Sequence, residues 1–473
     1  MWLNTGMPES NYSEFIKRFP LYQGTVKLDR LRQTEYSILD RENHIYLDYT
    51  GAGLYADSQL LKHHQLLREN VFGNPHSYNP TSLKSTELVE QTRAYILDFF
   101  NASPDEYVCI FTQNASGALK LVGEAYPFGE GCRYLLTFDN HNSVNGIREY
   151  AGAKGASVTY IPVVLPDLRA DEKRLMESLS QLDKGCFNLF AYSAQSNFSG
   201  VQHPLEWIEK AHTFGWDVLL DAAAYVPTNQ LDLSLWHPDF VPLSFYKMFG
   251  YPTGIGTLIA KKETLRKLSR SWFAGGTTTV ASVRGNKFYP ADAPAAFEDG
   301  TLNYLNIPAV EIGLKHLEEI GYETIHERVI YFTGWLIEKL IILEHGNGKP
   351  LVQMYGPLDT IARGGTVALN FFDARGELIP KHLLETEANQ RNISIRMGFF
   401  CNPGAGEVAL DISGDELSSC FSRPAYEDRI SDLDFQRCID PKASGAVRVS
   451  LGLVSNFNDI QAFLDFAEFF IEG

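Results

Sequence analysis

The sequence is poor in cysteine and in basic residues, and each shortage excludes a class of site. It contains six cysteines in 473 residues, and none belongs to a CxxC pair. We therefore expect neither a zinc site nor a disulfide framework, and we predict no metal site. Lysine and arginine number 41 against 58 aspartates and glutamates, for a formal net charge of -17. This negative charge disfavours nucleic acid and anionic membranes as partners.

Long apolar runs are also missing. No stretch approaches the roughly 18 apolar residues that a membrane-spanning helix needs. The first residues lack the basic stretch followed by an apolar stretch that marks a secretory signal. With 44% hydrophobic and 21% charged residues, the composition is that of an ordinary globular protein. We predict a cytoplasmic protein that does not contact membranes.

Apolar runs of strand length alternate with segments of helical spacing. In helical segments such as 83–100, apolar residues recur every three or four positions. The runs predict an α/β fold with a mostly parallel, doubly wound sheet. They are 107–112, 134–138, 157–163, 186–193, 217–223 and 240–246.

The last third of the chain has a different pattern. Amphipathic segments around 308–345 precede strand-like runs at 364–372, 393–398 and 446–452, and a closing helix is expected near 457–471. This predicts a smaller α+β domain. We divide the chain into an N-terminal segment (1–70) that packs on both domains, a large domain (71–310) and a small domain (311–473).

Polar residues follow several of the predicted strands, where ligands of open α/β sheets gather. Residues 114–117 open a helix, so they could bind a phosphate or simply cap that helix. His141 follows the next strand and could be a site residue or only a capping loop residue. Asn197 follows the fourth strand, and Asp221 stands in the fifth, where a buried carboxylate needs a cation.

Lys247 lies between an apolar strand and the glycine-rich turn GYPTGIG, 26 residues after Asp221. The two residues could form a structural ion pair. However, the glycines bring backbone close to something other than a side chain. A lysine, an acid on the neighbouring strand and a phosphate-suited helix start together fit pyridoxal phosphate.

Motifs along most of the chain strengthen this interpretation. They are IYLDYTGAGLYADSQL, AQSNFSGVQHPLEWIE, LDAAAYVPTNQLDLS, FVPLSFYKMFGYPTGIG, FEDGT and VRVSLG. Together they resemble the class V, fold-type I pyridoxal phosphate-dependent enzymes, and most of all the NifS-like cysteine desulfurase domain of molybdenum cofactor sulfurases. The resemblance implies the fold of that transferase family and the same cofactor.

The resemblance also implies roles for single residues. Lys247 would bind the cofactor covalently and shuttle protons, Asp221 would keep the ring nitrogen protonated, and Arg448 would bind the substrate carboxylate. His141 would stack on one face of the ring. Further implied contacts are Ala223 on the other ring face, Asn197 to the ring oxygen, and Ala115, Ser116 and Ser244 to the phosphate, with Thr277 reaching in from the second subunit of a homodimer.

The loop RMGFFCNPGAG (396–406) resembles the family sequence RTGCFCNPGAC. Cys401 matches the second cysteine and is the implied persulfide carrier, while Phe399 and Gly406 replace the other two. The implied reaction takes sulfur from L-cysteine and releases L-alanine. If Cys401 is only structural, a C–S lyase, epimerase or aminotransferase remains the alternative. The sulfur acceptor stays open among molybdenum cofactor, a separate protein and a small molecule.

Overall fold

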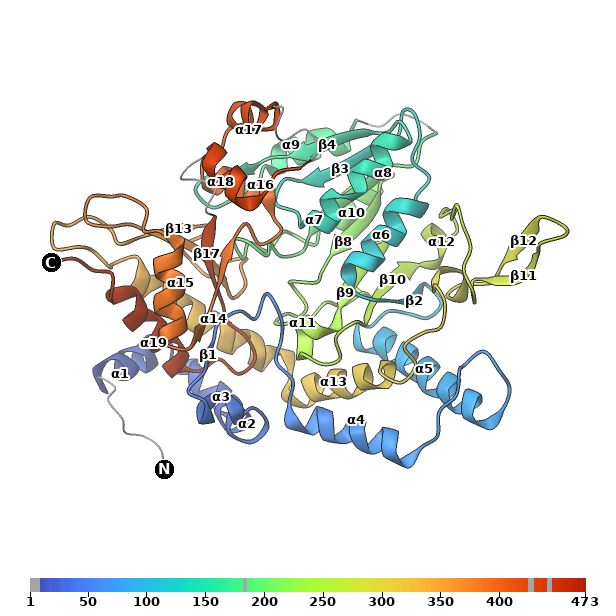
Figure 1. The fold of residues 1–473 in the computed structure, drawn as a ribbon, viewed down its shortest axis with the longest axis horizontal. Coiled ribbons are helices and arrows are strands. Elements are labelled where there is room, and N and C mark those ends of the chain that lie inside the picture. Colours follow the sequence, from blue (N-terminus) through green and yellow to red (C-terminus); the bar gives the residue numbers. More distant parts are fainter. Residues whose placement is uncertain (1–8, 182–184, 424–428, 440–444) are drawn as a thin grey trace.

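The computed structural model describes residues 9–181, 185–423, 429–439 and 445–473. Its centre is a seven-stranded sheet in the order β2-β10-β9-β8-β7-β3-β4 (Figure 1). Only β10 runs antiparallel to its neighbours, so the predicted mostly parallel sheet is confirmed. The strands are β2 (Tyr107–Thr112), β3 (Arg133–Thr137), β4 (Ser157–Ile161), β7 (Leu189–Ser193), β8 (Asp217–Asp221), β9 (Phe240–Ser244) and β10 (Gly256–Lys261).

Helices cover both faces of this sheet, because the strands are apolar on both sides. In β2, Val108 and Ile110 join the apolar cluster that contains α6 (Ala115–Ala125) and α8 (Ile147–Ala153). Cys109 and Phe111 join the opposite cluster, which contains α5 (Pro80–Phe99) and α13 (Ile307–Ile320). Alternate side chains of one strand point to opposite faces, so this arrangement gives the doubly wound architecture.

The small domain is built on a four-stranded antiparallel sheet in the order β13-β14-β17-β16. The predicted α+β character is confirmed, while the proposed boundaries at 70 and 310 stay predictions. The strands are β13 (Val352–Tyr355), β14 (Thr366–Phe371), β16 (Arg396–Gly398) and β17 (Ala446–Ser450), and α14 (Tyr322–Leu340), α15 (Lys381–Gln390) and α19 (Phe457–Glu468) share their apolar cluster.

The N-terminal helices contact the apolar clusters of both domains. Phe15 of α1 (Glu9–Arg18) joins the small-domain cluster, and Leu28 of α2 (Lys27–Glu35) joins a large-domain cluster. The buried Arg32 pairs with Asp459 of the closing helix at 2.7 Å. The first eight residues of the predicted N-terminal segment lie outside the described part of the chain.

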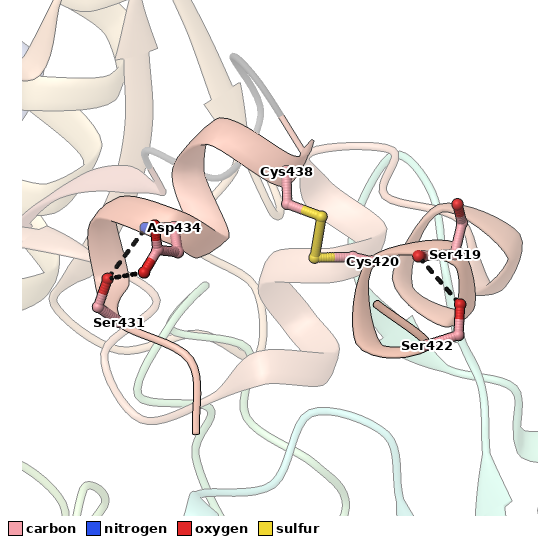
Figure 2. Close-up of a disulfide and its surroundings, with 6 residues drawn as sticks. All are labelled: Ser419, Cys420, Ser422, Ser431, Asp434 and Cys438. Atoms are coloured by element: carbon pink, nitrogen blue, oxygen red, sulfur yellow. Dashed lines mark hydrogen bonds between the residues drawn. A yellow bond between two sulfur atoms is a disulfide. The ribbon is translucent and has the colours of Figure 1, made fainter. Parts of the chain in front are cut away.

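One expectation about cysteine is wrong, because Cys420 and Cys438 form a disulfide (Figure 2). They lie on α17 (Gly414–Phe421) and α18 (Asp432–Ile439), 18 residues apart in sequence and 5.8 Å apart between Cα atoms. Packing of the two helices around Ile412 and Ile439 brings them together. Sequence spacing carries no signal for a bridge between two helices, which is why the pair was missed.

The other four cysteines carry thiol groups. Cys109 and Cys132 are buried, Cys186 is half-buried and Cys401 is exposed. No helix in the described ranges is long and apolar enough to cross a membrane.

Candidate active site

Lys247 lies just beyond the carboxyl end of β9, within the short helix α11 (Phe245–Phe249). Gly250 ends this helix with a φ of 76°. A side chain there would also meet the Leu54 backbone, at 2.5 Å. The Gly53 amide donates a hydrogen bond to the Tyr246 carbonyl, 3.0 Å away. The sheet and the N-terminal segment together therefore fix Lys247.

The electrostatic surroundings of Lys247 favour its neutral amine. Burial lowers the pKa of Lys247 below its ordinary value, and Arg448 lowers it further. The negative charges of Asp221 and Cys401 oppose this shift. A neutral amine is the form that acts as a nucleophile or accepts a proton. Four of the predicted site residues thus lie within electrostatic reach of one another.

His141 follows β3 and Asp221 ends β8, so both lie at the carboxyl ends of strands in the same sheet, with β7 between the two strands. Asp221 is buried at the end of β8, and its Oδ1 accepts a hydrogen bond from the Ala223 amide at 3.0 Å. His141 caps α7 (Asn142–Asn145), where its Nδ1 accepts from the Ser143 amide at 3.1 Å. Its Nε2 therefore carries the proton. Burial lowers the pKa of His141, and Asp221 only partly offsets this effect.

Hydroxyl groups gather at the N-terminus of α6. The Ala115 amide donates to Ser244 Oγ at 2.8 Å, and Ser116 Oγ lies 2.6 Å from Ser143 Oγ. Asn114 caps the helix by accepting from the Gly117 amide at 2.9 Å. The capping interpretation of residues 114–117 is confirmed. Phosphate binding stays a prediction, for which a helix start surrounded by hydroxyls is a suitable donor set. Ser143 is a member that sequence reasoning missed.

Asn197 joins the large domain to the cysteine loop. Its Nδ2 donates to the Phe400 carbonyl at 2.6 Å, and its Oδ1 accepts from Asn402 Nδ2 at 2.9 Å. Asn402 also donates to the Asp139 carbonyl at 2.8 Å. The Asn197 amide has two N–H groups, so one is left for the predicted contact with a cofactor oxygen. Asn402 was not predicted, although it lies in the quoted loop.

Cys401 is exposed, but hydrogen bonds hold the loop backbone at Phe400 and at Cys401 itself. Its carbonyl accepts a hydrogen bond from the Asn142 amide at 2.7 Å. Phe400 and Cys401 both have left-handed backbones, with φ of 54° and 56°. This conformation costs a non-glycine residue roughly 1–2 kcal/mol, so the surrounding bonds must hold it. A side chain at Gly404 would collide with the Phe138 carbonyl, so the loop also approaches the sheet closely.

Arg448 is buried on β17, and its guanidinium uses only part of its N–H groups within the described residues. Its two Nη atoms donate to the Asn197 carbonyl at 3.0 Å and to Asp48 Oδ1 at 2.9 Å. Its Nε is buried and has no partner among the described residues. A buried N–H without a partner is costly, so this group is suited to a ligand oxygen. Together with the phosphate-suited helix start, Lys247 and Asp221, it gives a donor set that fits pyridoxal phosphate and an amino acid.

Asp48 and Arg396 are site residues that sequence reasoning missed. Asp48 binds Arg448 and also Arg396, whose Nη2 lies 2.6 Å from Asp48 Oδ2. Both residues lie in quoted motifs, but no role was given to them. The available signal was the acidic residue in the apolar stretch IYLDY, which needs a cation when it is buried.

Thr277 is not part of this group in the single chain that the structure contains. Within the described residues, its Oγ1 bonds to the Ala274 backbone, at 2.9 Å to both N and O. It directly precedes the hairpin of β11 (Thr278–Ser282) and β12 (Lys287–Pro290), which projects from the large domain (Figure 1). Its predicted contribution to a second subunit stays a prediction.

The chain has clear relatives. Residues 45–463 match the model of the family described as aminotransferase class-V. A molybdenum cofactor sulfurase of Solanum lycopersicum is 35% identical and covers 97% of this chain and 60% of its own length. The Homo sapiens molybdenum cofactor sulfurase is 38% identical over 94% of this chain and 51% of its own length. This chain thus spans only about half to three fifths of these relatives.

Solved structures support the fold. An apo cysteine desulfurase of Thermococcus onnurineus superposes with a TM-score of 0.74 at 22% identity, covering 93% of this chain and 97% of its own. A cysteine desulfurase of Escherichia coli gives 0.68 at 17% identity, with 98% of both chains covered. Family match and relatives agree over nearly the whole described length. The chain therefore belongs to the aminotransferase class V family of pyridoxal phosphate-dependent enzymes.

Proposed function

We propose that this chain is a cysteine desulfurase, which moves sulfur from L-cysteine to Cys401 and releases L-alanine. The observation that carries the proposal is the placement of Cys401. It is exposed, held in a fixed loop, and within electrostatic reach of both Lys247 and Arg448. A purely structural cysteine is usually buried and remote from charged groups. The names of the relatives, which are sulfurases, agree with this role.

Arg448 would bind the substrate through its carboxylate. A guanidinium presents a planar set of N–H donors that matches a carboxylate. In this chain Asp48 and Asn197 each accept one N–H from its two Nη atoms, and the buried Nε would be available to the substrate together with the remaining Nη N–H groups. The orientation of the substrate would therefore be set before the reaction begins.

Lys247 would move the protons. Pyridoxal phosphate, when bound, withdraws electrons from the substrate and so labilises the bonds at its Cα. Lys247 Nζ would accept the Cα proton, for which its lowered pKa keeps a neutral amine available. Asp221 would hold the proton of the cofactor's ring nitrogen, and the neutral His141 ring would pack on the cofactor.

Cys401 would accept the sulfur as a thiolate. Its sulfur attacks the substrate sulfur, an S–S bond forms, and the C–S bond of the substrate breaks. The released electron pair passes to the carbon skeleton, which is protonated to alanine. Cysteine and the Cys401 thiol thus become alanine and a Cys401 persulfide, with no outside oxidant needed.

The test measures sulfide and alanine together after incubation of the purified, cofactor-loaded protein with L-cysteine and a reductant. We expect equal amounts of both products, and mass spectrometry without reductant should find the extra sulfur on Cys401. Cys186, which is half-buried, is the internal control. Sulfide accompanied by pyruvate instead of alanine would replace the proposal with a C–S lyase.

We also propose a homodimer that completes the phosphate site with Thr277. Several apolar side chains of the projecting hairpin region are exposed, including Val283 at 99% and Tyr289 at 52%. Exposed apolar clusters mark association surfaces. Analytical ultracentrifugation of Val283→Asp and of the wild-type protein tests the dimer. A monomeric wild-type protein with full activity would contradict it.

The proposal also covers the sulfur acceptor and the cellular location. We propose molybdenum cofactor as the acceptor, since the matched relatives are named for it, although this chain spans only 51–60% of their length. Transfer of ³⁵S from labelled Cys401 persulfide to that cofactor is the direct test. A cytoplasmic location is proposed on composition alone.

A further inference from the structure

Two arginines of the small domain share a single carboxylate beside the cysteine loop. Arg396 of β16 and Arg448 of β17 stand directly opposite each other in an antiparallel pair. Asp48 accepts from Arg396 Nε at 3.0 Å and Nη2 at 2.6 Å, and from Arg448 Nη2 at 2.9 Å. Two guanidinium groups against one carboxylate leave one positive charge uncompensated.

The two arginines differ in exposure. The Arg448 side chain is 3% exposed and its free Nε is suited to the substrate, whereas the Arg396 side chain is 51% exposed. Arg396 is also the residue that begins the cysteine loop, five positions before Cys401. Gly51 leaves room for this arrangement, since a side chain there would lie 2.5 Å from Asp48 Oδ2 and 2.7 Å from Arg396 Nη2.

The residue immediately before Cys401 packs on this group: the guanidinium carbon of Arg448 lies 4.7 Å from the centre of the Phe400 ring. The Phe400 carbonyl accepts from Asn197, whose own carbonyl accepts from Arg448. Hydrogen bonding to Asp48 is the main reason why the pKa of Arg396 is raised, and a negative charge on Cys401 raises it further. The same charge acts on Lys247 and on Tyr246 of α11. On α16 (Pro403–Ala409), which follows the loop, the acidic Glu407 interacts instead with Arg148.

We propose that Arg396, held in place by Asp48, is the cation that stabilises the anionic forms of Cys401, namely the thiolate before sulfur transfer and the persulfide after it. Asp48 is a positioning residue for both arginines, one for the substrate carboxylate and one for the acceptor sulfur. This inference rests on the proposed role of Cys401. Lys247 serves the substrate during the reaction, whereas Arg396 stays available to the loop throughout.

The test follows alkylation of Cys401 by iodoacetamide, which requires no turnover. Rates are measured by peptide mass spectrometry between pH 5.5 and 9.5 for the holoenzyme, Arg396→Gln and Arg396→Lys. We expect Arg396→Gln to slow Cys401 alkylation at pH 7 about tenfold, because the thiolate is the reactive form and loses its neighbouring cation. Arg396→Lys should restore most of the rate because it keeps the charge.

Two controls make the result specific. Cys186 in the same samples should show no change, and Arg391→Gln, which removes a partly exposed arginine paired with Glu387, should leave Cys401 alkylation as in the wild type. Added salt should reduce the difference between wild type and Arg396→Gln if it is electrostatic. Identical pH profiles for the wild type and Arg396→Gln would overturn the inference.

Failure of this inference can be distinguished from failure of the proposed function. If the persulfide forms on Cys401 but the Arg396 variants alkylate Cys401 at the wild-type rate, the inference is wrong and the desulfurase proposal stands. If alkylation depends on Arg396 but L-cysteine never yields a persulfide, the desulfurase proposal is wrong. Asp48→Asn should slow Cys401 alkylation less than Arg396→Gln and should also raise the KM for L-cysteine, because Asp48 holds Arg448 as well. An unchanged KM would overturn the positioning role.

Discussion

The cofactor region and the cysteine loop are built in opposite ways. Lys247 and Asp221 lie at the ends of fully buried strands, inside the large domain, and burial lowers the pKa of Lys247. Cys401 belongs to the small domain, is exposed, and depends on hydrogen bonds to backbone carbonyls and amides. The sheet fixes the first region, whereas a few side-chain amides fix the second. Mutations in the cysteine loop should therefore leave cofactor binding unchanged.

The largest expected effect is that of Lys247→Ala. Turnover should fall by about 10³-fold or more, because the variant loses the amine that binds the cofactor and moves the protons. The cofactor should still bind non-covalently, since Asp221 and the hydroxyls at α6 are unchanged. In the wild type, borohydride should fix the cofactor to Lys247, as peptide mapping can show. Lys261→Ala, which loses a mostly buried lysine next to Glu106, should remain active.

Cys401→Ser tests whether the two regions act in succession. Alanine production should fall at least about 100-fold because the nucleophile is lost. Exchange of the substrate's Cα proton with deuterated water should continue, since it depends on Lys247. Cys186→Ser is the matched control. If Cys401→Ser produced alanine at the wild-type rate, the persulfide mechanism would be contradicted and a lyase or aminotransferase would be favoured.

The disulfide of the small domain should stabilise the helices beyond the loop and not the cofactor region. Closing a loop of about this size, 18 residues, is worth roughly 3 kcal/mol. Cys438→Ser should speed hydrogen exchange in α17 and α18 and leave cofactor absorbance unchanged. Cys420→Ser and the double variant should behave alike, because either change removes the same bond. A double variant with faster hydrogen exchange than either single variant would contradict a disulfide between Cys420 and Cys438.

A thiol titration of protein isolated without oxidation is also informative about location. Disulfides are rare in the reducing cytosol. Six free thiols would fit a cytoplasmic protein, whereas four would speak against that expectation.

Asn402→Ala should release the cysteine loop alone. It leaves the Asp139 carbonyl and Asn197 Oδ1 without their donor and removes the cap of α16, at a local cost of about 2 kcal/mol. Hydrogen exchange over 396–402 should rise, with unchanged cofactor binding. Ser413→Ala removes the comparable cap of α17, outside the site, and should not affect this loop. An equal rise of hydrogen exchange over 396–402 in both variants would contradict the role of Asn402 in holding the loop.

The smallest effect concerns histidine and pH. Burial lowers the pKa of His316 on α13, as it does for His141 in the site. A lowered folded-state pKa gives stability that is present above the unfolded value of 6.5 and is lost as pH falls. His316→Gln should therefore lose less stability than the wild type between pH 7.5 and 5.5, by under about 1 kcal/mol. Urea unfolding at both pH values measures the free energy of unfolding. An equal loss of this free energy in the wild type and in His316→Gln would contradict the prediction.

Much of the fold could be predicted from strand-length apolar runs. Segment 107–112 is a strand with the predicted bounds, and residues at the strand ends do gather, as for Asp221 and His141. The run GTLIAK of β10 was missed because it directly follows a turn that was interpreted only for its glycines. Segment 393–398 is two strands, of which one pairs with β1 (Ile45–Tyr46), a partner almost 350 residues away. Such long-range pairing leaves no local pattern.

Local sequence patterns identify the residues that could carry chemistry: a lysine, an acid and a histidine after apolar strands, and a cysteine in a Gly/Pro loop. They suffice for this, since burial and turn geometry depend on neighbouring residues. The folded chain is needed to show that Asp48 joins Arg396 to Arg448, that Asn197 and Asn402 hold the cysteine loop, and that Cys420 bonds to Cys438. These contacts join segments that are distant in sequence, and their geometry is set by how the two domains pack.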